Sequence, residues 1–154
     1  LLWHGSGMAN WCSIIKNGFR LPNTLKGVQM TGWMFGAGTY FSNMFSKSLG
    51  YTRYQSSNGY ACLSLSEVAL GTPYKLTHAE YDIDEKKLEH LKCHSAHGMG
   101  KTTVDAKYKF DDRIVVPCGD ICELGIDSAL LYDEFIVYNV KQICQKYIVI
   151  VKVM

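Results

Sequence analysis

Helical and strand-like patterns do not alternate regularly along this 154-residue chain. Near the start, Met8, Trp11 and Ile14 recur at helical spacing, and Gly18 then offers a C-terminal stop. Apolar runs that are typical of strands dominate the second half. We expect helices over 7–17, 43–50 and 84–91. Ser6 would cap the first helix, and Ser42 or Asn43 would cap the second. We expect strands over 1–5, 39–41, 60–70, 74–77, 113–116, 134–138 and 146–153.

This order of elements predicts an α+β fold with a mostly antiparallel or mixed sheet, because a parallel, doubly wound sheet requires regular strand–helix alternation. The length suits one domain that buries roughly two thirds of its unfolded surface. Hydrophobic residues make up 47% of the chain and charged residues 19%. That composition excludes disorder and supports a packed core without metals or disulfides.

Charge and cysteine content narrow the possible partners. A net charge of +2 is too small to imply nucleic-acid binding, which normally shows as a concentrated basic face. The six cysteines are irregularly spaced without a Cys-x-x-Cys pair, unlike a disulfide-stapled secreted module. The sequence contains no signal peptide and no membrane-length apolar run. We therefore expect an intracellular, reducing compartment and no membrane partner. Because Leu1 already lies in an apolar run, we also expect the chain to be a piece of a longer protein.

Two segments are expected to be loops. Residues 21–38 contain Pro22 and four glycines, and loops of that length are usually functional or mobile. Residues 93–112 are rich in Gly, Thr and Lys.

Glu134, His4 and Tyr40 are candidates for a functional site. Period-two alternation over 130–138 puts Asp133 and Glu134 on opposite faces, so one carboxylate lies near the apolar side or at the end of the strand. A buried carboxylate needs a partner, whereas an acid at a strand edge simply faces water. His4 ends the first expected strand beside a glycine, which lets a ligand approach the backbone. Tyr40 follows the glycine-rich loop. Taken singly, His4 also fits a structural role and Tyr40 fits core packing.

Seven short motifs resemble the catalytic domain of the poly(ADP-ribose) polymerase family, in that family's order and across nearly the whole chain. They are Leu-Trp-His-Gly-Ser (2–6), Gly-Phe-Arg (18–20), Thr-Gly-Trp-Met-Phe-Gly-Ala-Gly-Thr-Tyr-Phe (31–41), Ser-Lys-Ser (46–48), Ser-Glu-Val-Ala-Leu-Gly (66–71), Gly-Met-Gly-Lys-Thr (98–102) and Leu-Tyr-Asp-Glu-Phe-Ile-Val-Tyr (131–138). The chain is most similar to the DNA-damage-responsive, chain-forming members. The resemblance implies the ADP-ribosyltransferase fold, in which two small, mostly antiparallel sheets with flanking helices surround an NAD cleft.

The resemblance also implies residue roles. His4, Tyr40 and Glu134 match a catalytic His-Tyr-Glu triad. In that family, Gly5 and Ser48 would hold the nicotinamide carboxamide while Tyr40 and Tyr51 enclose its ring. The implied NAD-binding positions are His4, Gly5, Ser6, Arg20, Tyr40, Phe41, Lys47, Ser48 and Tyr51. The implied acceptor-side positions are Met34, Lys47 and Tyr132, and residues 21–33 match the donor loop beside the NAD phosphates.

Glu134 would stabilise oxocarbenium character on the ribose and, as in the family, polarise the incoming hydroxyl during chain extension. The intact triad favours polymerisation over transfer of a single unit. The chain departs from close members at Trp33, Ala37 and Thr39, where Tyr, Lys and Ile are common. Those changes concern the glycine-rich loop and leave the triad intact.

The resemblance thus predicts an NAD-dependent poly(ADP-ribosyl)transferase that modifies protein acceptors and growing ADP-ribose chains, with NAD as co-substrate and no metal. It predicts one catalytic domain over 1–154 without the helical regulatory subdomain, monomeric in isolation and active without a DNA signal. A nuclear location and a part in DNA repair are inferred from the relatives. A mono-ADP-ribosyltransferase and a non-catalytic NAD- or ADP-ribose-binding module of the same fold are the alternatives.

Three other readings are weaker. Residues 98–102 look like the end of a phosphate loop, but Ser95 stands where its first glycine should be. Residues 36–38 lack the third glycine and the helix of a dinucleotide fingerprint. A zinc site could be imagined from His90, Cys93, His94, His97, Cys118 and Cys122, but their spacing matches no standard finger.

Overall fold

The computed structural model describes residues 1–22 and 33–154. Its fold is α+β, as predicted, although the described residues form three small sheets where the resemblance implied two. The strands are β1 (Leu2–Ser6), β2 (Thr39–Phe41), β3 (Tyr60–Val68), β4 (Pro73–Leu76), β5 (Ser95–Gly98), β6 (Gly100–Lys109), β7 (Val115–Glu123), β8 (Leu130–Tyr132), β9 (Glu134–Val137) and β10 (Ile143–Lys152). The helices are η1 (Met8–Asn10), α1 (Trp11–Asn17), α2 (Phe45–Leu49), η3 (Tyr54–Ser57), α3 (Glu85–His90) and η4 (Val140–Gln142).

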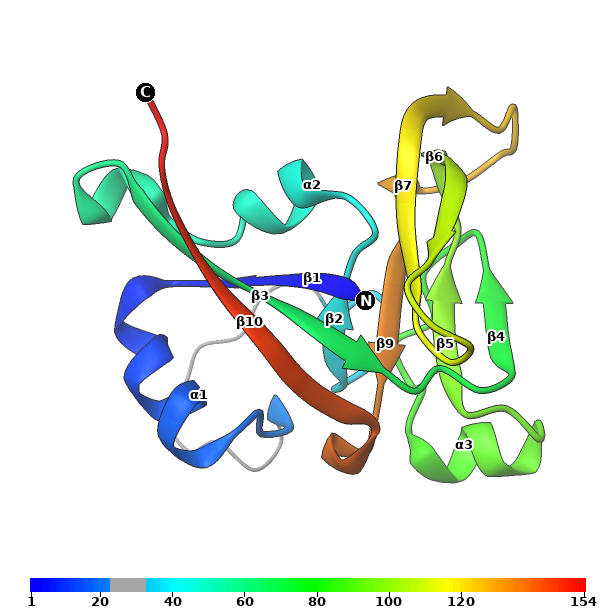
Figure 1. Ribbon diagram of the computed structural model, residues 1–154. Helices are drawn as coiled ribbons and strands as arrows, with labels where there is room; N and C mark the ends of the chain where they lie inside the picture. The colour runs from blue at the N-terminus through cyan, green and yellow to red at the C-terminus, as the bar shows by residue number, and fades with distance from the viewer. Residues whose placement is uncertain (23–32) are drawn as a thin grey trace.

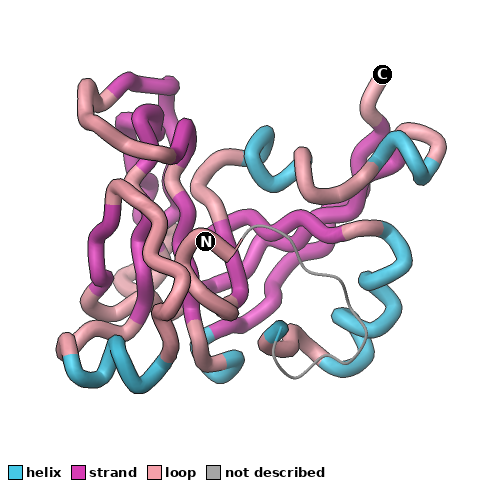
Figure 2. The backbone as a smooth tube through the Cα atoms, turned by 180° about the vertical axis from the view of Figure 1, so that it is seen from behind, coloured by secondary structure: helices cyan, strands magenta, loops and turns pink. Residues whose placement is uncertain are grey.

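The sheets have the strand orders β1-β3-β10, β2-β9-β5-β4 and β7-β6-β8. The first sheet lies beside the other two, and α1 and α2 lie near its β1 strand (Figure 1). Seen from behind, the helices lie at the margins of the strands (Figure 2). Most neighbouring strands are antiparallel, and the parallel pairs are β4–β5 and β6–β8. The mixed sheet expected from the order of elements is therefore present.

The second sheet separates two hydrophobic clusters. Side chains alternate along β9, so Ile136 packs into one cluster with Phe35 and Leu88, while Val137 packs into the other with Leu2 and Phe41. Because β9 pairs with β2 on one side and β5 on the other, it lies inside this sheet and is held from both edges. This rigid strand begins at Glu134.

The segment 93–112, predicted to be a loop, instead contains β5 and all of β6. β6 pairs with β7 in a long antiparallel hairpin, and β7 runs to Glu123, well past the predicted strand over 113–116. Both strands expose most of their residues. An exposed strand does not need apolar alternation, so the pattern that normally reveals a strand is missing here.

The first two helices begin later than predicted. Ser6 ends β1 rather than capping α1, which starts at Trp11 after the short helix η1. The second helix, α2, starts at Phe45 with Met44 as its N-cap residue. Ser42 is held elsewhere, because its backbone forms a bridge with Trp3. For α3 the prediction was close, since the Asp84 carboxylate caps it by accepting a hydrogen bond from the Lys87 N–H.

Candidate active site

A cleft of about 1040 Å³ is lined by residues of β1, α1, β2 and α2. His4, Tyr40 and Glu134 all line it, although 36 and 94 positions separate them in the sequence. The bridge between Trp3 and Ser42 joins the first sheet to the second and so brings β1 next to the end of β2. Three distant segments therefore meet around one space.

Strand register explains why Tyr40 and Glu134 face the same cleft. Tyr40 on β2 lies directly opposite Ile136 on β9, so their side chains project from the same face of the sheet. Glu134 is two residues before Ile136 and shares that face. Its side chain is buried, with a relative exposure of 8%. The simple reading of Glu134 as an acid at a strand edge facing water is therefore wrong.

The His4 imidazole is fixed in one orientation. Its Nδ1 lies 2.7 Å from the backbone oxygen of Tyr40, and its ring packs edge-on against Phe19 with centroids 4.9 Å apart. Burial lowers the pKa of His4, and the hydrogen bond to the Tyr40 carbonyl offsets only part of that effect. Since a carbonyl oxygen only accepts, the neutral ring carries its proton on Nδ1. Nε2 is then left as an acceptor.

Glu134 is paired with Lys47, which projects from α2. The Lys47 Nζ lies 2.7 Å from Glu134 Oε1. Burial alone would lower the pKa of Lys47, but the hydrogen bond and the charge of Glu134 outweigh it and raise the pKa. The ammonium also lies 5.5 Å from the centre of the Tyr51 ring. A charged pair therefore stands at the wall of the cleft, held between two different elements.

The Tyr40 hydroxyl is used in holding the chain that precedes it. It accepts a hydrogen bond from the Phe35 N–H at 3.0 Å and donates one to the Gly36 carbonyl at 2.8 Å. Burial raises the pKa of Tyr40 far above its ordinary value, with a smaller contribution from the charge of Glu134. The phenol stays protonated, so the aromatic ring is the part of Tyr40 available to the cleft.

Gly5 lies where another residue would not fit. A Cβ at this position would stand 1.9 Å from the Ser48 carbonyl oxygen. Trp3, two residues earlier, turns its N–H and C=O away from β3 toward Ser42. By the alternation of a strand, Gly5 turns its own backbone groups to that same side, which is the side of the cleft. The Ser48 hydroxyl, also at the cleft, donates to the Trp3 carbonyl at 3.1 Å.

The remaining predicted NAD-binding residues, Ser6, Arg20, Phe41 and Tyr51, also line the cleft. Ser6 Oγ accepts from the Asn10 side chain at 2.8 Å, and Phe41 packs against His4 with ring centroids 5.6 Å apart. Tyr51 is 52% exposed. All nine positions named for NAD therefore surround a single cleft.

The acceptor-side prediction is divided. Lys47 lines the cleft, but within the described residues Met34 and Tyr132 lie outside its wall. Met34 packs against the cluster around Phe35. Most of the predicted donor loop, residues 23–32, lies outside the described residues; Trp33 at its end does line the cleft.

Several cleft residues were not singled out from the sequence. Asn10 and Ser13 come from η1 and α1, and Arg53 and Ser56 come from the segment around η3. Each is an exposed polar residue with no distinctive spacing, so the sequence pattern does not mark it as a site residue. The one local signal is conformational, since Arg53 has a φ of 52°.

Within residues 1–22 and 33–154, no group of three or more His, Cys, Asp or Glu side chains is placed to hold a metal ion. The possible phosphate loop is absent as well, because Gly98 ends β5 and residues 100–102 begin β6 rather than a helix.

Among the described helices, none is both long and apolar enough to cross a membrane.

Comparison with known proteins gives a family match over almost the full length. The family model for "Poly(ADP-ribose) polymerase catalytic domain" matches residues 1–153. The chain is 40% identical over 155 residues to Poly [ADP-ribose] polymerase 2 of Arabidopsis thaliana, an alignment that covers 99% of the chain and 24% of that protein. It is 39% identical over 154 residues to Poly [ADP-ribose] polymerase 1 of Gallus gallus, covering 99% of the chain and 15% of that protein. The chain thus spans about a quarter or less of the length of these relatives.

Proposed function

Because the chain belongs to the poly(ADP-ribose) polymerase catalytic domain family, we propose that it cleaves nicotinamide from NAD and transfers the ADP-ribose to protein acceptors and to growing ADP-ribose chains. The observation that carries the proposal is the meeting of His4, Tyr40 and Glu134 at one cleft. A histidine acceptor can bind a ribose hydroxyl, an aromatic face can stack on the nicotinamide ring, and a carboxylate can stabilise positive charge on the ribose as the bond to nicotinamide breaks.

NAD would lie along this cleft with its nicotinamide at the Gly5 end. The Gly5 N–H and C=O match the C=O and N–H of a carboxamide, and the ring would stack between Tyr40 and Tyr51. The Ser48 hydroxyl would donate a second hydrogen bond after turning from the Trp3 carbonyl. The His4 Nε2 would accept a hydrogen bond from a hydroxyl of the adenosine ribose. Ser6 and Arg20 would lie beside the same half of the substrate.

In this mechanism Glu134 acts on the ribose next to the nicotinamide. As the C–N glycosidic bond breaks, the electron pair leaves with nicotinamide and positive charge develops on the ribose. The Glu134 carboxylate binds the 2′-hydroxyl and stabilises that charge. It then polarises the acceptor hydroxyl, whose oxygen forms the new bond to the same ribose carbon while its proton is released. Lys47 holds the carboxylate in place at 2.7 Å.

The acceptor would approach from the side of Lys47, with Met34 and Tyr132 contributing to its binding surface. Residues 1–154 form one catalytic domain in this proposal, with the helical regulatory subdomain outside them. The domain would be monomeric in isolation, would need no metal and would not itself bind nucleic acid or membranes. A nuclear place of action and a role in DNA repair are proposed from the family resemblance alone.

Incubation of the purified chain with labelled NAD, without DNA, tests the proposal. We expect nicotinamide release and a ladder of labelled products that lengthens with time. Single-unit modification would instead assign a mono-ADP-ribosyltransferase, and binding without nicotinamide release would assign a non-catalytic module. Activity that appears only after addition of broken DNA would contradict the proposed independence from a DNA signal.

A further inference from the structure

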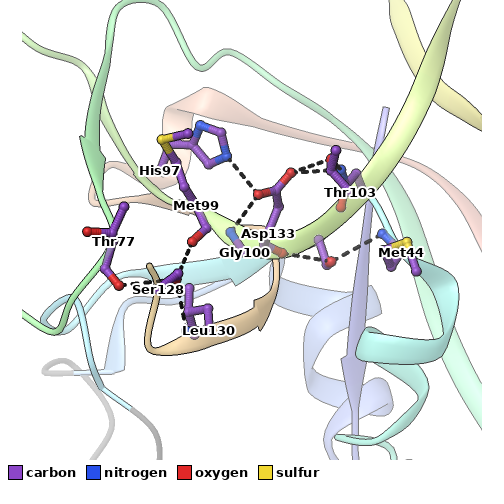
Figure 3. Close-up of polar contacts among 11 residues, drawn as sticks. Met44, Thr77, His97, Met99, Gly100, Thr103, Ser128, Leu130 and Asp133 are labelled. Atoms are coloured by element: carbon purple, nitrogen blue, oxygen red, sulfur yellow. Dashed lines mark hydrogen bonds and ion pairs between the residues drawn. The ribbon is translucent and has the colours of Figure 1, made fainter. Parts of the chain in front are cut away.

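Asp133, the residue before Glu134, is buried between β8 and β9, and its carboxylate is the centre of the network in Figure 3. Oδ1 accepts from the Gly100 N–H at 2.8 Å and lies 3.3 Å from His97 Nε2, in ion-pair range but out of line for a well-formed hydrogen bond. Oδ2 accepts from Thr103 Oγ1 at 2.6 Å and from Asn43 Nδ2 at 3.1 Å. Two oxygens thus contact four groups from three segments of the chain.

One of these segments leads into α2. Asn43 bonds the Asp133 side chain, and Ser42 Oγ donates to the Asp133 backbone oxygen at 2.9 Å. Ser42 Oγ also accepts from the Met44 N–H at 3.1 Å. Lys47 follows four residues after Asn43 on α2. Both partners of the Lys47–Glu134 pair are therefore attached, within a few residues, to Asp133.

The other segments are β5 and the start of β6. At the start of β6, Gly100 permits the close contact with Asp133. A Cβ on Gly100 would stand 2.3 Å from the backbone carbon of Tyr132 and 2.6 Å from the Asp133 nitrogen. Only glycine lets β6 come close enough for its N–H to reach the carboxylate. The second glycine of the Gly-Met-Gly-Lys-Thr motif thus serves Asp133 rather than a phosphate.

The network keeps Asp133 ionised despite its burial. Burial alone would raise the pKa of Asp133, but the interactions with His97, Thr103 and the Gly100 N–H outweigh it and lower the pKa. A buried carboxylate that lost such partners would be costly, so the network resists local displacement of β9. Within the described residues, Asp133 is absent from the cleft wall and has no direct access to a substrate there.

We propose that Asp133 is a positioning residue for Glu134: its network fixes the first residue of β9 and the segment that leads into α2, and so sets the place of the Lys47–Glu134 pair at the cleft. This inference rests on the proposed NAD-cleaving function. The effect on catalysis arises through Glu134, since a carboxylate displaced by a fraction of an ångström stabilises the developing charge less well.

Four variants of the full chain test the proposal through the kinetics of nicotinamide release. Asp133→Asn keeps the shape but replaces one accepting oxygen with a donor, and Thr103→Val removes the 2.6 Å donor. Thr103→Ser restores that donor, and Lys101→Gln is a control at an exposed neighbour on β6. We expect kcat to fall by roughly 10- to 100-fold for Asp133→Asn while KM for NAD stays within about twofold. Thr103→Val should show a smaller fall in kcat that Thr103→Ser reverses.

Folding and structure are followed in parallel, by thermal unfolding and by amide hydrogen exchange at Gly100 and Glu134. If Asp133→Asn does not fold, the Thr103→Val and Thr103→Ser pair decides. Unchanged kinetics in the folded variants, or a rise in KM with kcat preserved, would overturn the positioning role. If the wild-type chain releases no nicotinamide, the proposed function fails, and the network is judged by exchange alone. Faster exchange of both amides in Thr103→Val, reversed in Thr103→Ser, would support it, and unchanged exchange would overturn it.

Discussion

The cleft and the β6–β7 hairpin are built in opposite ways. The cleft brings together side chains from β1, β2 and β9, and its titratable groups are held by contacts across long stretches of sequence. The hairpin pairs two consecutive strands, and its large side chains Tyr108, Phe110 and Ile121 are each more than 60% exposed. A change at the cleft therefore affects several elements at once, whereas a change at one of these exposed hairpin side chains stays local.

The largest effect is expected at Glu134. Glu134→Gln keeps the size of the side chain but removes the charge that stabilises the ribose cation, so kcat for nicotinamide release should fall by about 10²- to 10³-fold and elongation should cease. NAD should still bind, because the groups proposed for the nicotinamide lie on β1, on β2 and around α2. Labelled-NAD ladders and calorimetric NAD titration measure the two properties. Glu123→Gln, at the exposed end of β7, is the matched control; unchanged ladders in Glu134→Gln would refute the assigned role.

Gly5 gives the next largest effect. Gly5→Ala forces a methyl group against the Ser48 carbonyl oxygen, which a Cβ would approach to 1.9 Å, so β1 and α2 must move apart. We expect a loss of about 1–3 kcal/mol in the free energy of unfolding, together with weaker NAD binding. Denaturant unfolding checks the first effect and titration the second. Gly7→Ala is the control, because the nearest atom to its Cβ is 4.0 Å away. Equal stability of the two variants would show that β1 and α2 are not tightly packed.

The same contrast separates what the sequence could predict from what it could not. Buried strands such as β2, β3 and β9 were placed to within two residues of their observed ends, because burial imposes apolar patterns. β6 and its partner β7 carry no such pattern, since most of their residues face solvent, which accepts any polar residue on a strand. The start of α2 was missed for another reason. Ser42 has the chemistry of a helix cap, but the distant Trp3 and Asp133 engage it.

For the site, residue types and resemblance could name His4, Tyr40 and Glu134, but the contacts that hold them were beyond prediction. Period-two alternation correctly separated Asp133 from Glu134, yet it suggested that only one of them avoids water. Both are buried, at 5% and 6% exposure. Burial of the second acid depends on Gly100, Thr103 and Asn43, which reach it from segments 30 to 90 residues away. Contacts between such distant segments are set by tertiary packing and cannot be predicted from local sequence propensity.

The pH dependence of stability gives a subtler test of the cleft. Burial holds the pKa of His4 below the ordinary value of 6.5, so the unfolded chain takes up a proton first as the pH falls. The contribution of neutral His4 to stability is therefore complete above pH 6.5, declines as the pH falls below that value, and levels off beneath the lower folded-state pKa. Unfolding free energies of the wild type and His4→Gln between about pH 5 and pH 8 isolate this contribution. Parallel curves for the two proteins would contradict a buried, neutral His4.

The smallest effect is expected on the hairpin, at Ile121, which pairs with Val104 and is 64% exposed. Ile121→Thr keeps a β-branched side chain that suits a strand, so the free energy of unfolding should change by less than about 0.5 kcal/mol and kcat should not change. The same replacement at Ile136, fully buried on β9, leaves a hydroxyl in an apolar cluster and should cost several-fold more. Denaturant unfolding of both variants compares the two regions directly. If Ile121→Thr destabilised the chain as much as Ile136→Thr, the hairpin would have to be packed against another surface in solution, and the contrast with the cleft would not hold.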